Sequence, residues 1–238
     1  MTVKAGAPPS PLEGDQPLAT AVIPAWNEAG RIGATVRALR SVPEVGDILV
    51  VDDGSTDATA AEAAGAGARV LRLPRRRGKA AAVRRGLEAV GSPVILLLDA
   101  DLGDSAAHAG ALLAPVLAGE ADMTVGRLPP SGRGGGFGLV VGTARWALRR
   151  LAGVGLDQPL SGQRALRRDA LAAVRTWGWG FGLELALSLQ VLRAGFAVRE
   201  VDTAFAHRVT GFAWRHLLHR ARQLAHVWIT LLLLALRR

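Results

Sequence analysis

The first half of this chain alternates short apolar runs with alanine-rich stretches, and this alternation limits the folds open to it. The apolar runs have the length of buried strands, and the stretches between them have the length of helices. Strands are expected at 19–24, 47–52, 68–73, 93–98 and 121–126, and helices at 28–40, 57–66, 79–90 and 106–118. This order predicts an α/β fold with a parallel, doubly wound sheet, which binds ligands beyond the carboxyl ends of its strands.

The second half of the chain shows weaker patterns. Residues 128–138 are rich in Gly and Pro, which is typical of a mobile loop over the ligand crevice or of a plain surface loop. Since neither a repeat nor a linker is visible, we expect one domain at 19–211, a flexible leader at 1–18 and a terminal helical segment at 212–238. Further elements are expected as helices near 142–151, 169–174 and 183–194 and as a strand near 198–202.

Composition excludes several classes of chemistry. The chain has 238 residues, half of them hydrophobic, which is enough for the core of one domain. It has no cysteine, so disulfides, zinc thiolates and thiol catalysis are excluded. Residues 1–18 lack the apolar run of a secretory signal. These features are compatible with a cytoplasmic protein.

Positive charge is concentrated at the carboxyl terminus. The formal net charge is +9, no acidic residue follows Asp202, and four of the five histidines lie beyond it. Such a tail favours an anionic partner such as lipid headgroups, phosphate or nucleic acid. Its arginines are Arg208, Arg215, Arg220, Arg222, Arg237 and Arg238.

The terminal helical segment has an amphipathic first part and an apolar second part. Residues 227–236 are apolar apart from Thr230. Ten helical residues span roughly 15 Å, about half of a bilayer core, so this part is too short to cross a membrane. The pattern fits a helix lying on the inner face of a membrane. It fits equally well a helix that packs on the core or joins two copies in a homodimer.

Asp99 and Asp101 follow the apolar strand expected at 93–98 and form the strongest chemical motif. Alternate residues at a strand end can present two carboxylates to one site, and hard oxygen ligands suit Mg²⁺ or Mn²⁺. Such an ion stabilises the charge left on a diphosphate when a sugar–phosphate bond breaks. The alternative is that Asp99 caps a turn and Asp101 is solvated.

Two other strand ends also carry polar residues. The first strand runs into PAWNE at 24–28, and the second runs into DDGSTD at 52–57. A carboxylate at Asp52 or Asp53 could accept hydrogen bonds from a base or a ribose, while the Gly, Ser and Thr that follow suit a tight, helix-capping turn. A capped turn without a ligand is the alternative for both aspartates.

A basic loop with the sequence RRRGK at 75–79 opens the helix expected at 79–90. Side chains and backbone amides at a helix N-terminus attract phosphate, so Lys79 is a candidate for contact with a donor diphosphate. The loop is not a P-loop, because Ala80 stands where Ser or Thr is required. The alternative is a solvated basic face.

The segments VIPAWNE, VVDDGSTD, RGKAAAVRRGL and LLLDADLG, in this order, resemble the GT-A glycosyltransferases of the large family 2, which includes dolichyl-phosphate mannosyltransferases and cellulose synthase-like enzymes. The resemblance covers roughly residues 19–126. In the second half, PLSGQRA, GFGLE and HRVTG are most similar to glucosyl-3-phosphoglycerate synthases and their bacterial relatives. Polyprenyl-phosphate glycosyltransferases are a second similar group.

The resemblance implies a division of roles among the donor-site residues. It implies that Glu28 and Asp52 contact the nucleoside, that Lys79 meets the diphosphate, and that Asp101 holds the metal with His207 completing the metal site. Glycosyltransferases of this kind imply Mg²⁺ or Mn²⁺ as cofactor. The expected donor site comprises Pro24, Glu28, Asp52, Lys79, Asp99, Ala100 and Asp101.

Glu184 is the expected catalytic residue on the acceptor side. It follows a Gly- and Trp-rich turn and opens an apolar helix. Its own chemistry allows a general base or a helix-start charge favoured by the dipole. The resemblance places it near the sugar or the acceptor hydroxyl. His207, taken alone, is either a metal ligand through its neutral imidazole or a surface histidine.

The sequence therefore predicts a metal-dependent glycosyltransferase. Its donor is expected to be UDP-linked, and its acceptor either a phosphorylated small molecule such as 3-phosphoglycerate or a polyprenyl phosphate. A nucleotidyltransferase of related fold is the alternative, although such enzymes usually carry a Gly-rich basic loop where this chain has PAWNEAGR. Nucleic acid is not an expected partner, because aromatic residues are sparse and the basic residues cluster on one terminal helix.

Overall fold

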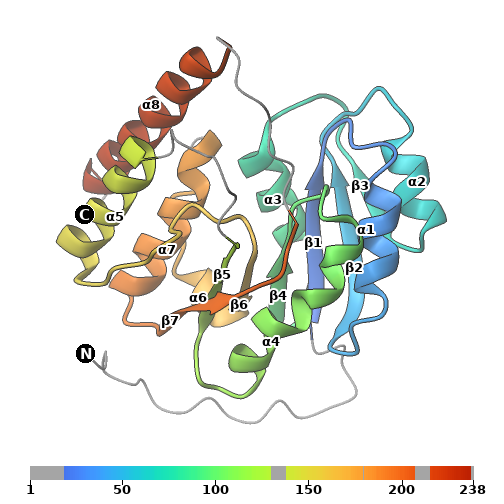
Figure 1. Ribbon diagram of the computed structural model, residues 1–238, viewed down its shortest axis with the longest axis horizontal. Helices are drawn as coiled ribbons and strands as arrows, with labels where there is room; N and C mark the ends of the chain where they lie inside the picture. Colours follow the sequence, from blue (N-terminus) through green and yellow to red (C-terminus); the bar gives the residue numbers. More distant parts are fainter. Residues whose placement is uncertain (1–18, 130–137, 179, 207–214, 237–238) are drawn as a thin grey trace.

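The computed structural model describes residues 19–129, 138–178, 180–206 and 215–236 (Figure 1). Within these, the side chains of 181, 215–223 and 235–236 are not described. The leader expected at 1–18 and His207 lie outside the described residues, and so does most of the Gly- and Pro-rich segment at 128–138. The domain boundaries at 19, 211 and 212 remain predictions.

The centre of the molecule is a single seven-stranded sheet with the strand order β3-β2-β1-β4-β6-β5-β7. All five strands expected in the first half are present, and the strand expected at 198–202 is confirmed. The strands are β1 (Ala19–Ala25), β2 (Val45–Asp52), β3 (Arg69–Arg72), β4 (Val94–Leu97), β5 (Met123–Arg127), β6 (Arg164–Arg167) and β7 (Val198–Asp202).

The sheet is mixed: the five strands predicted in the first half run parallel to one another, but β6, which was not predicted, runs antiparallel to its neighbours. β1 pairs in parallel with β2 and β4, and β5 pairs in parallel with β7. β6 lies antiparallel between β4 and β5. No sequence pattern indicates β6, because its four residues begin and end with arginine and show neither an apolar run nor a clear alternation.

The strands of the first half are apolar on both faces because helices cover both sides of the sheet. Residues of β1 alternate between two separate cores. Val22 belongs to the core that also includes residues of α3, α5, α7 and α8, whereas Ile23 belongs to the core that includes residues of α1 and α4. The helices are α1 (Ile32–Leu39), α2 (Thr59–Gly65), α3 (Lys79–Glu88), η1 (Gly103–Ala109), α4 (Gly110–Leu117), α5 (Gly138–Ala152), α6 (Arg168–Ala172), η2 (Gly180–Gly182), α7 (Leu183–Arg193) and α8 (Arg215–Leu236).

The helices α5, α7 and α8 form a group at one end of the molecule, opposite the end that carries α1 and α2 (Figure 1). α7 lies between the sheet and the other two helices of this group, because it contacts β7, α5 and α8. One face of the predicted apolar stretch of the terminal helix is core, since Val227, Leu231 and Leu234 are buried. The core-packing alternative for this helix is therefore correct for that face.

Close approach of α3 to the sheet positions the start of that helix. A Cβ atom on Gly86 would lie 2.5 Å from Val22 and 2.8 Å from Val51, so only glycine lets α3 lie this close to β1 and β2. The first residue of α3 is Lys79. Its side chain is thereby brought to the carboxyl ends of the parallel strands.

Candidate active site

A cavity of about 360 Å³ lies beyond the carboxyl ends of β1, β2 and β4. The structure brings six of the seven predicted donor-site residues to this cleft, and only Asp52 is missing from its walls. The walls contain two cations, Lys79 and Arg76, and four carboxylates. The lining residues are Pro24, Ala25, Trp26, Glu28, Asp53, Arg76, Gly78, Lys79, Ala82, Asp99, Ala100 and Asp101.

Lys79 joins the two halves of the predicted site. Its Nζ lies 2.8 Å from Oδ1 of Asp99 and 3.0 Å from Oε1 of Glu184. Burial opposes the charged form of Lys79, but the two carboxylates outweigh it and raise the pKa of Lys79 far above its ordinary value. Glu184 does not line the cavity itself, but it contacts Lys79, which does. The structure thus connects the expected phosphate contact to the expected catalytic carboxylate.

The segment before β6 supports this ion pair from the other side. Nε2 of Gln163 donates a hydrogen bond to Oδ2 of Asp99 at 2.8 Å. A Cβ atom on Gly162 would lie 2.8 Å from Nζ of Lys79 and 2.9 Å from Oδ2 of Asp99. Gly162 therefore leaves the space that the pair occupies. Both residues belong to the segment PLSGQRA, whose resemblance to an acceptor-side segment indicated no contact with Asp99.

Asp101 is the cleft carboxylate best placed to hold a metal ion. Within the described part of the chain its carboxylate makes no hydrogen bond or ion pair, whereas both oxygens of Asp99 are engaged by Lys79 and Gln163. A carboxylate that is free in this way suits Mg²⁺ or Mn²⁺, which keep several waters and also take phosphate oxygens. Among the described residues, no three Asp, Glu or His side chains are arranged so that they could hold one metal ion together, and His207 lies outside those residues.

The turn that carries Asp101 is held in place by α1. The hydroxyl of Thr35, a fully buried residue of α1, donates to the carbonyl of Ala100 at 2.8 Å and accepts from the amide of Gly103 at 2.9 Å. Gly103 has a positive φ of 55°. Sequence pattern alone does not reveal this clamp, because a threonine within an apolar helix is common and specifies no partner.

Glu28 follows the carboxyl end of β1 and lines the same cleft as Asp101. Partial burial raises the pKa of Glu28, Arg31 opposes that shift, and the negative charge of Asp101 adds to it. Its carboxylate receives a hydrogen bond from Arg31 at 2.7 Å. Burial is the main cause of the raised pKa of Glu28, and the smaller contribution of Asp101 is one that a bound cation would offset.

The first two aspartates of the DDGSTD turn, Asp52 and Asp53, have structural partners. Asp52 is fully buried, accepts the amide of Ser55 at 2.9 Å and pairs with Arg72 at 3.1 Å. Asp53 lines the cleft, but its two oxygens accept the amides of Arg77 and Gly78, each at 2.7 Å. For Asp52 the nucleoside contact stays a prediction, and in the structure its carboxylate is a turn-capping group.

The same contacts change the interpretation of the basic loop. The amides of Arg77 and Gly78, at the start of α3, already bond to Asp53, so they do not point freely at a phosphate. The loop passes so close to the DDGSTD turn that a Cβ atom on Gly54 would lie 2.7 Å from the backbone of Arg76. Gly54 also has a positive φ of 71°. The side chains of the basic loop, rather than these two amides, are therefore available to attract a phosphate.

Arg76 is the side chain best placed for that task. Its guanidinium carbon lies 3.5 Å from the centre of the Trp26 ring, a stacked cation–π contact at the rim of the cleft. Arg76 makes no ion pair with the residues that the structure describes. Lys79, by contrast, is neutralised by two carboxylates. The charge of the loop is visible in the sequence, but its contact with Trp26 is not.

Arg164 is a buried charge that no sequence pattern indicated. It has no exposed surface, and its guanidinium donates to the carbonyls of Pro159 and Ser161 and to the hydroxyl of Ser188. Burial lowers the pKa of Arg164 to about 10, against the attraction of Glu184 and Glu200. The side chain thus fixes the segment before β6 onto α7, close to Glu184.

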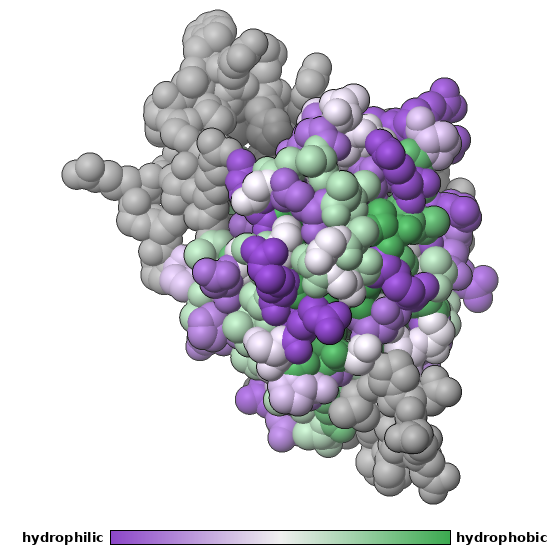
Figure 2. Space-filling model, turned by 90° about the vertical axis from the view of Figure 1, so that its right-hand side faces the viewer, coloured by the Kyte–Doolittle hydropathy of each residue, from purple (hydrophilic) through white to green (hydrophobic). Residues whose placement is uncertain are grey.

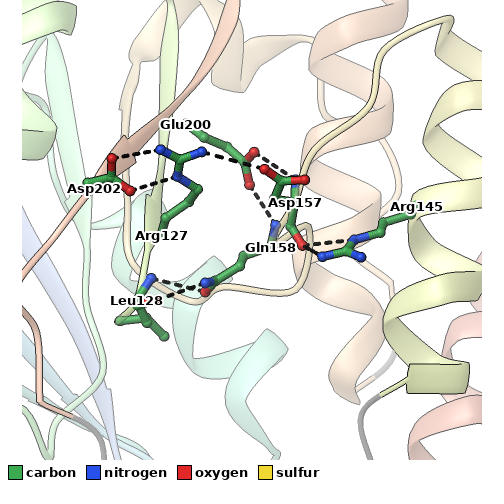
Figure 3. Close-up of polar contacts among 7 residues, drawn as sticks. All are labelled: Arg127, Leu128, Arg145, Asp157, Gln158, Glu200 and Asp202. Carbon is green, nitrogen blue, oxygen red and sulfur yellow. Dashed lines mark hydrogen bonds and ion pairs between the residues drawn. The ribbon is translucent and has the colours of Figure 1, made fainter. Parts of the chain in front are cut away.

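A polar network anchors the other end of the same segment (Figure 3). Arg127 at the end of β5 forms two hydrogen bonds with Asp202 at the end of β7, at 2.8 and 2.7 Å. Glu200 accepts the amides of Asp157 and Gln158. The network holds residues 157–158 at the sheet edge, from which the chain runs on to Gly162 and Gln163. Its members are Arg127, Leu128, Arg145, Asp157, Gln158, Glu200 and Asp202.

The fold and this cleft define a glycosyltransferase of the GT-A class, as the solved structures similar to it show. Glucosyl-3-phosphoglycerate synthase from Mycobacterium tuberculosis in complex with Mg²⁺ and UDP has a TM-score of 0.73 and 29% identity, covering 90% of this chain and 78% of that one. Its complex with Mn²⁺, UDP-glucose and phosphoglyceric acid has a TM-score of 0.70 and 28% identity, covering 89% and 79%.

The chain belongs to glycosyl transferase family 2, which matches residues 20–156. An uncharacterised glycosyltransferase of Mycobacterium tuberculosis is 33% identical over 81% of this chain and 87% of its own length. A dodecaprenyl-phosphate galacturonate synthase of Rhizobium johnstonii is 30% identical over 44% of this chain and 34% of its own length. Membership of this family decides against the nucleotidyltransferase alternative.

Proposed function

We propose that this glycosyltransferase takes a hexose from a UDP-linked donor and transfers it to an anionic acceptor with the help of Mg²⁺ or Mn²⁺. The observation that carries the proposal is the cleft itself, which Lys79 and Arg76 line together with the free carboxylate of Asp101. The similar solved structures support the choice of donor, since they are complexes with UDP or UDP-glucose and one of these two metals.

In this proposal the chain's own residues divide the work at the donor. Trp26 offers a ring face for the base, and Glu28 lies beside it as a hydrogen-bond acceptor for the nucleoside. Arg76 and Lys79 receive the diphosphate. Asp101, with His207, would hold the metal, which when bound stabilises the charge on the departing diphosphate. The main role of Asp99 in this proposal is to hold Lys79 in position, rather than to bind the metal.

Glu184 is proposed as the carboxylate on the acceptor side. In the structure its Oε1 is bonded to Lys79, so it becomes available to an acceptor hydroxyl when Lys79 turns to the diphosphate. The acceptor proposed is either a phosphorylated small molecule such as 3-phosphoglycerate or a lipid phosphate. Each of the two is supported by the name of one similar protein.

The donor and the metal can be tested together by thermal stabilisation. A panel of nucleotide sugars is added with and without Mn²⁺, and a bound donor raises the melting temperature by mass action. We expect UDP-sugars to stabilise the wild type most when Mn²⁺ is present. Asp101→Ala should lose the metal-dependent part, whereas Asp104→Ala, an exposed aspartate outside the cleft, should keep it. Equal stabilisation of Asp101→Ala and the wild type refutes Asp101 as the metal ligand.

The role of Glu184 can be separated from its contact with Lys79 by kinetics. If it acts as the base, Glu184→Gln lowers kcat by about a hundredfold or more and leaves the affinity for UDP unchanged. A raised KM for the donor at unchanged kcat would instead make Glu184 a positioning residue that acts through Lys79.

We also propose that the protein works in the cytoplasm at the inner face of the membrane, with the segment 212–238 in contact with it. The absence of acidic residues after Asp202 supports this placement. Within the described part of the chain, no helix is both long and apolar enough to pass through a membrane.

A further inference from the structure

The large exposed apolar side chains gather on two neighbouring helices. Six such side chains are exposed in the described residues, and all but Trp26 belong to α5 or α8. The face at the opposite end of the molecule, by contrast, mixes hydrophilic residues with smaller hydrophobic areas (Figure 2). The five residues, which we call the two-helix face, are Leu139 (79% exposed), Trp146 (54%), Trp228 (52%), Ile229 (45%) and Leu232 (60%).

The two-helix face is continuous from one helix to the other. The ring centres of Trp146 and Trp228 are 6.5 Å apart. Beside them lies an open groove lined by Leu139, Gly142 and Thr143. The inner face of α8 packs through Val227, Leu231 and Leu234, so the outer residues are not needed for the core. An apolar surface of this kind marks an interaction site.

Charge decides which partner this face fits. Neither α5 nor α8 contains an acidic residue. Arg149 and Arg150 are exposed on α5. The sequence of α8 carries Arg215, Arg220 and Arg222. The partner must therefore offer an apolar layer together with negative charge.

We propose that the two-helix face of α5 and α8 binds the interface of an anionic lipid bilayer, with Trp146 and Trp228 inserted at the headgroup level. Tryptophan has an apolar body and a polar N–H, which suits this depth, and arginine beside it pairs with anionic headgroups. The inference extends the membrane contact that forms part of the proposed function, and it adds α5 as half of the contact surface.

A second copy of the chain fits this face less well. An isologous dimer brings the same surface of both copies together. Arg149 and Arg150 of each copy would then meet a helix pair without any acidic residue, so like charges would be brought together without compensation. A bilayer supplies the missing negative charge.

The face is also connected to the acceptor side of the active site. α8 packs against η2, the turn that leads directly into Glu184. A Cβ atom on Gly182 would collide with Thr230 of α8, and one on Gly180 would collide with His226. A bilayer bound by α8 would thus be connected, through η2, to Glu184, the carboxylate proposed to meet the acceptor.

The test is co-sedimentation of the full chain with vesicles, measured without any donor. We expect binding to vesicles of phosphatidylcholine with phosphatidylglycerol and little binding to pure phosphatidylcholine. Leu139→Ser with Trp146→Ser changes only exposed positions on α5, and Trp228→Ser changes α8. Each should lower the partition coefficient by about tenfold or more, because the buried apolar area falls. Trp26→Ser, an exposed tryptophan at the cleft, is the matched control and should bind as the wild type does.

A charge pair of variants completes the design. Arg149→Glu with Arg150→Glu should lower binding to anionic vesicles, whereas Arg37→Glu, an exposed arginine on α1, should change it little. Far-ultraviolet circular dichroism confirms that each variant is folded. Unchanged co-sedimentation of the α5 variants overturns the inference. The inference is also overturned if the wild type does not bind vesicles and light scattering shows instead that it is a dimer which these substitutions dissociate. Since no donor is present, neither result bears on sugar transfer.

Discussion

Lys79 is the central residue of the candidate site, because its ammonium group forms ion pairs with both Asp99 and Glu184. A cation held by two carboxylates stays charged across the whole range of physiological pH, as its raised pKa indicates. Its positive charge is, however, already balanced. The donor diphosphate must therefore compete for Lys79 or draw on a second cation, and among the described residues Arg76 is the cleft cation without an ion pair.

We predict that Arg76→Ala weakens the binding of UDP by about tenfold or more, since a hydrogen bond between charged groups contributes roughly 1.5–3 kcal/mol. Uridine, which has no phosphate, should bind at least as well, because the Trp26 ring is uncovered. Titration calorimetry with UDP and with uridine measures both. Arg75→Ala, an exposed neighbour that does not line the cleft, serves as the control. Equal losses for UDP and uridine would contradict a phosphate role.

Glu28 predicts a measurable pH dependence of stability. Its pKa is raised in the folded protein, mainly by burial and further by Asp101, so the folded state holds this proton to a higher pH than the unfolded state does. A raised carboxyl pKa means stability that is present below the unfolded pKa and is lost as pH rises through the folded pKa.

The variant Glu28→Gln has no carboxyl group at this position, so it does not lose stability in this way as pH rises. The stability of the variant relative to the wild type should therefore increase between about pH 4 and about pH 7, while its affinity for UDP decreases. Urea unfolding at the two pH values checks the first part. A difference in unfolding free energy that is the same at both pH values would show that the pKa of Glu28 is not raised.

At the scale of elements, α8 and η2 are joined more closely than side chains would allow. Gly182 leaves no room for a Cβ atom, whose nearest neighbours would be Thr230 and the backbone carbonyl of His226. Because backbone atoms of α8 are among these neighbours, a methyl group can be accommodated only if the helix moves. The position of Glu184, two residues further on, depends on the same contact.

Gly182→Ala should therefore destabilise the protein by about 1–3 kcal/mol, as overpacking does, and lower turnover more than donor affinity. Gly142→Ala is the matched control, since Gly142 lies in α5 with open space around it and alanine favours a helix by about 1 kcal/mol. Thermal unfolding of the two variants compares them directly. Equal stability of Gly182→Ala and the wild type would mean that α8 yields without resistance.

At the scale of the whole molecule, the site draws on elements from both halves of the chain. The cleft takes Glu28, Lys79 and Asp101 from the first half, and Gln163 and Glu184 come from the second. The two cores on either face of the sheet are joined by the same strands. A donor bound in the cleft should therefore stabilise the chain as one unit.

We expect UDP at about one hundred times its dissociation constant, with Mn²⁺ present, to raise the unfolding free energy by about 2.7 kcal/mol without changing the denaturant slope. Circular dichroism follows the helices, and tryptophan fluorescence reports all six tryptophans, among them Trp26 in the cleft and Trp146 on α5. Both midpoints should move together. Midpoints that separate when UDP is added would show that the two ends of the molecule unfold independently.

The α/β class, the five strands of the first half and the positions of the polar strand ends could all be predicted from the amino-acid sequence. Apolar runs buried on both faces are visible without coordinates because helices on both sides leave no polar positions in them. The same reasoning placed the residues of the polar strand ends at one crevice, because parallel strands end at the same edge of a sheet. The structure confirms this for Pro24, Glu28, Asp99, Ala100 and Asp101, whereas Asp52 does not line the cleft. Lys79 was predicted there on separate grounds, from the basic loop at the start of its helix.

The contacts between these residues, in contrast, could not be predicted, because they depend on how distant elements pack together. The segment leading into the antiparallel β6 carries Gly162 and Gln163 to Asp99, and α7 carries Glu184 to Lys79, across separations that no local pattern encodes. The same is true of Asp53, which takes the amides expected for phosphate, and of Trp146, which meets Trp228. Such contacts depend on the register and packing of distant elements, and single-sequence periodicity reports only which face of an element is buried.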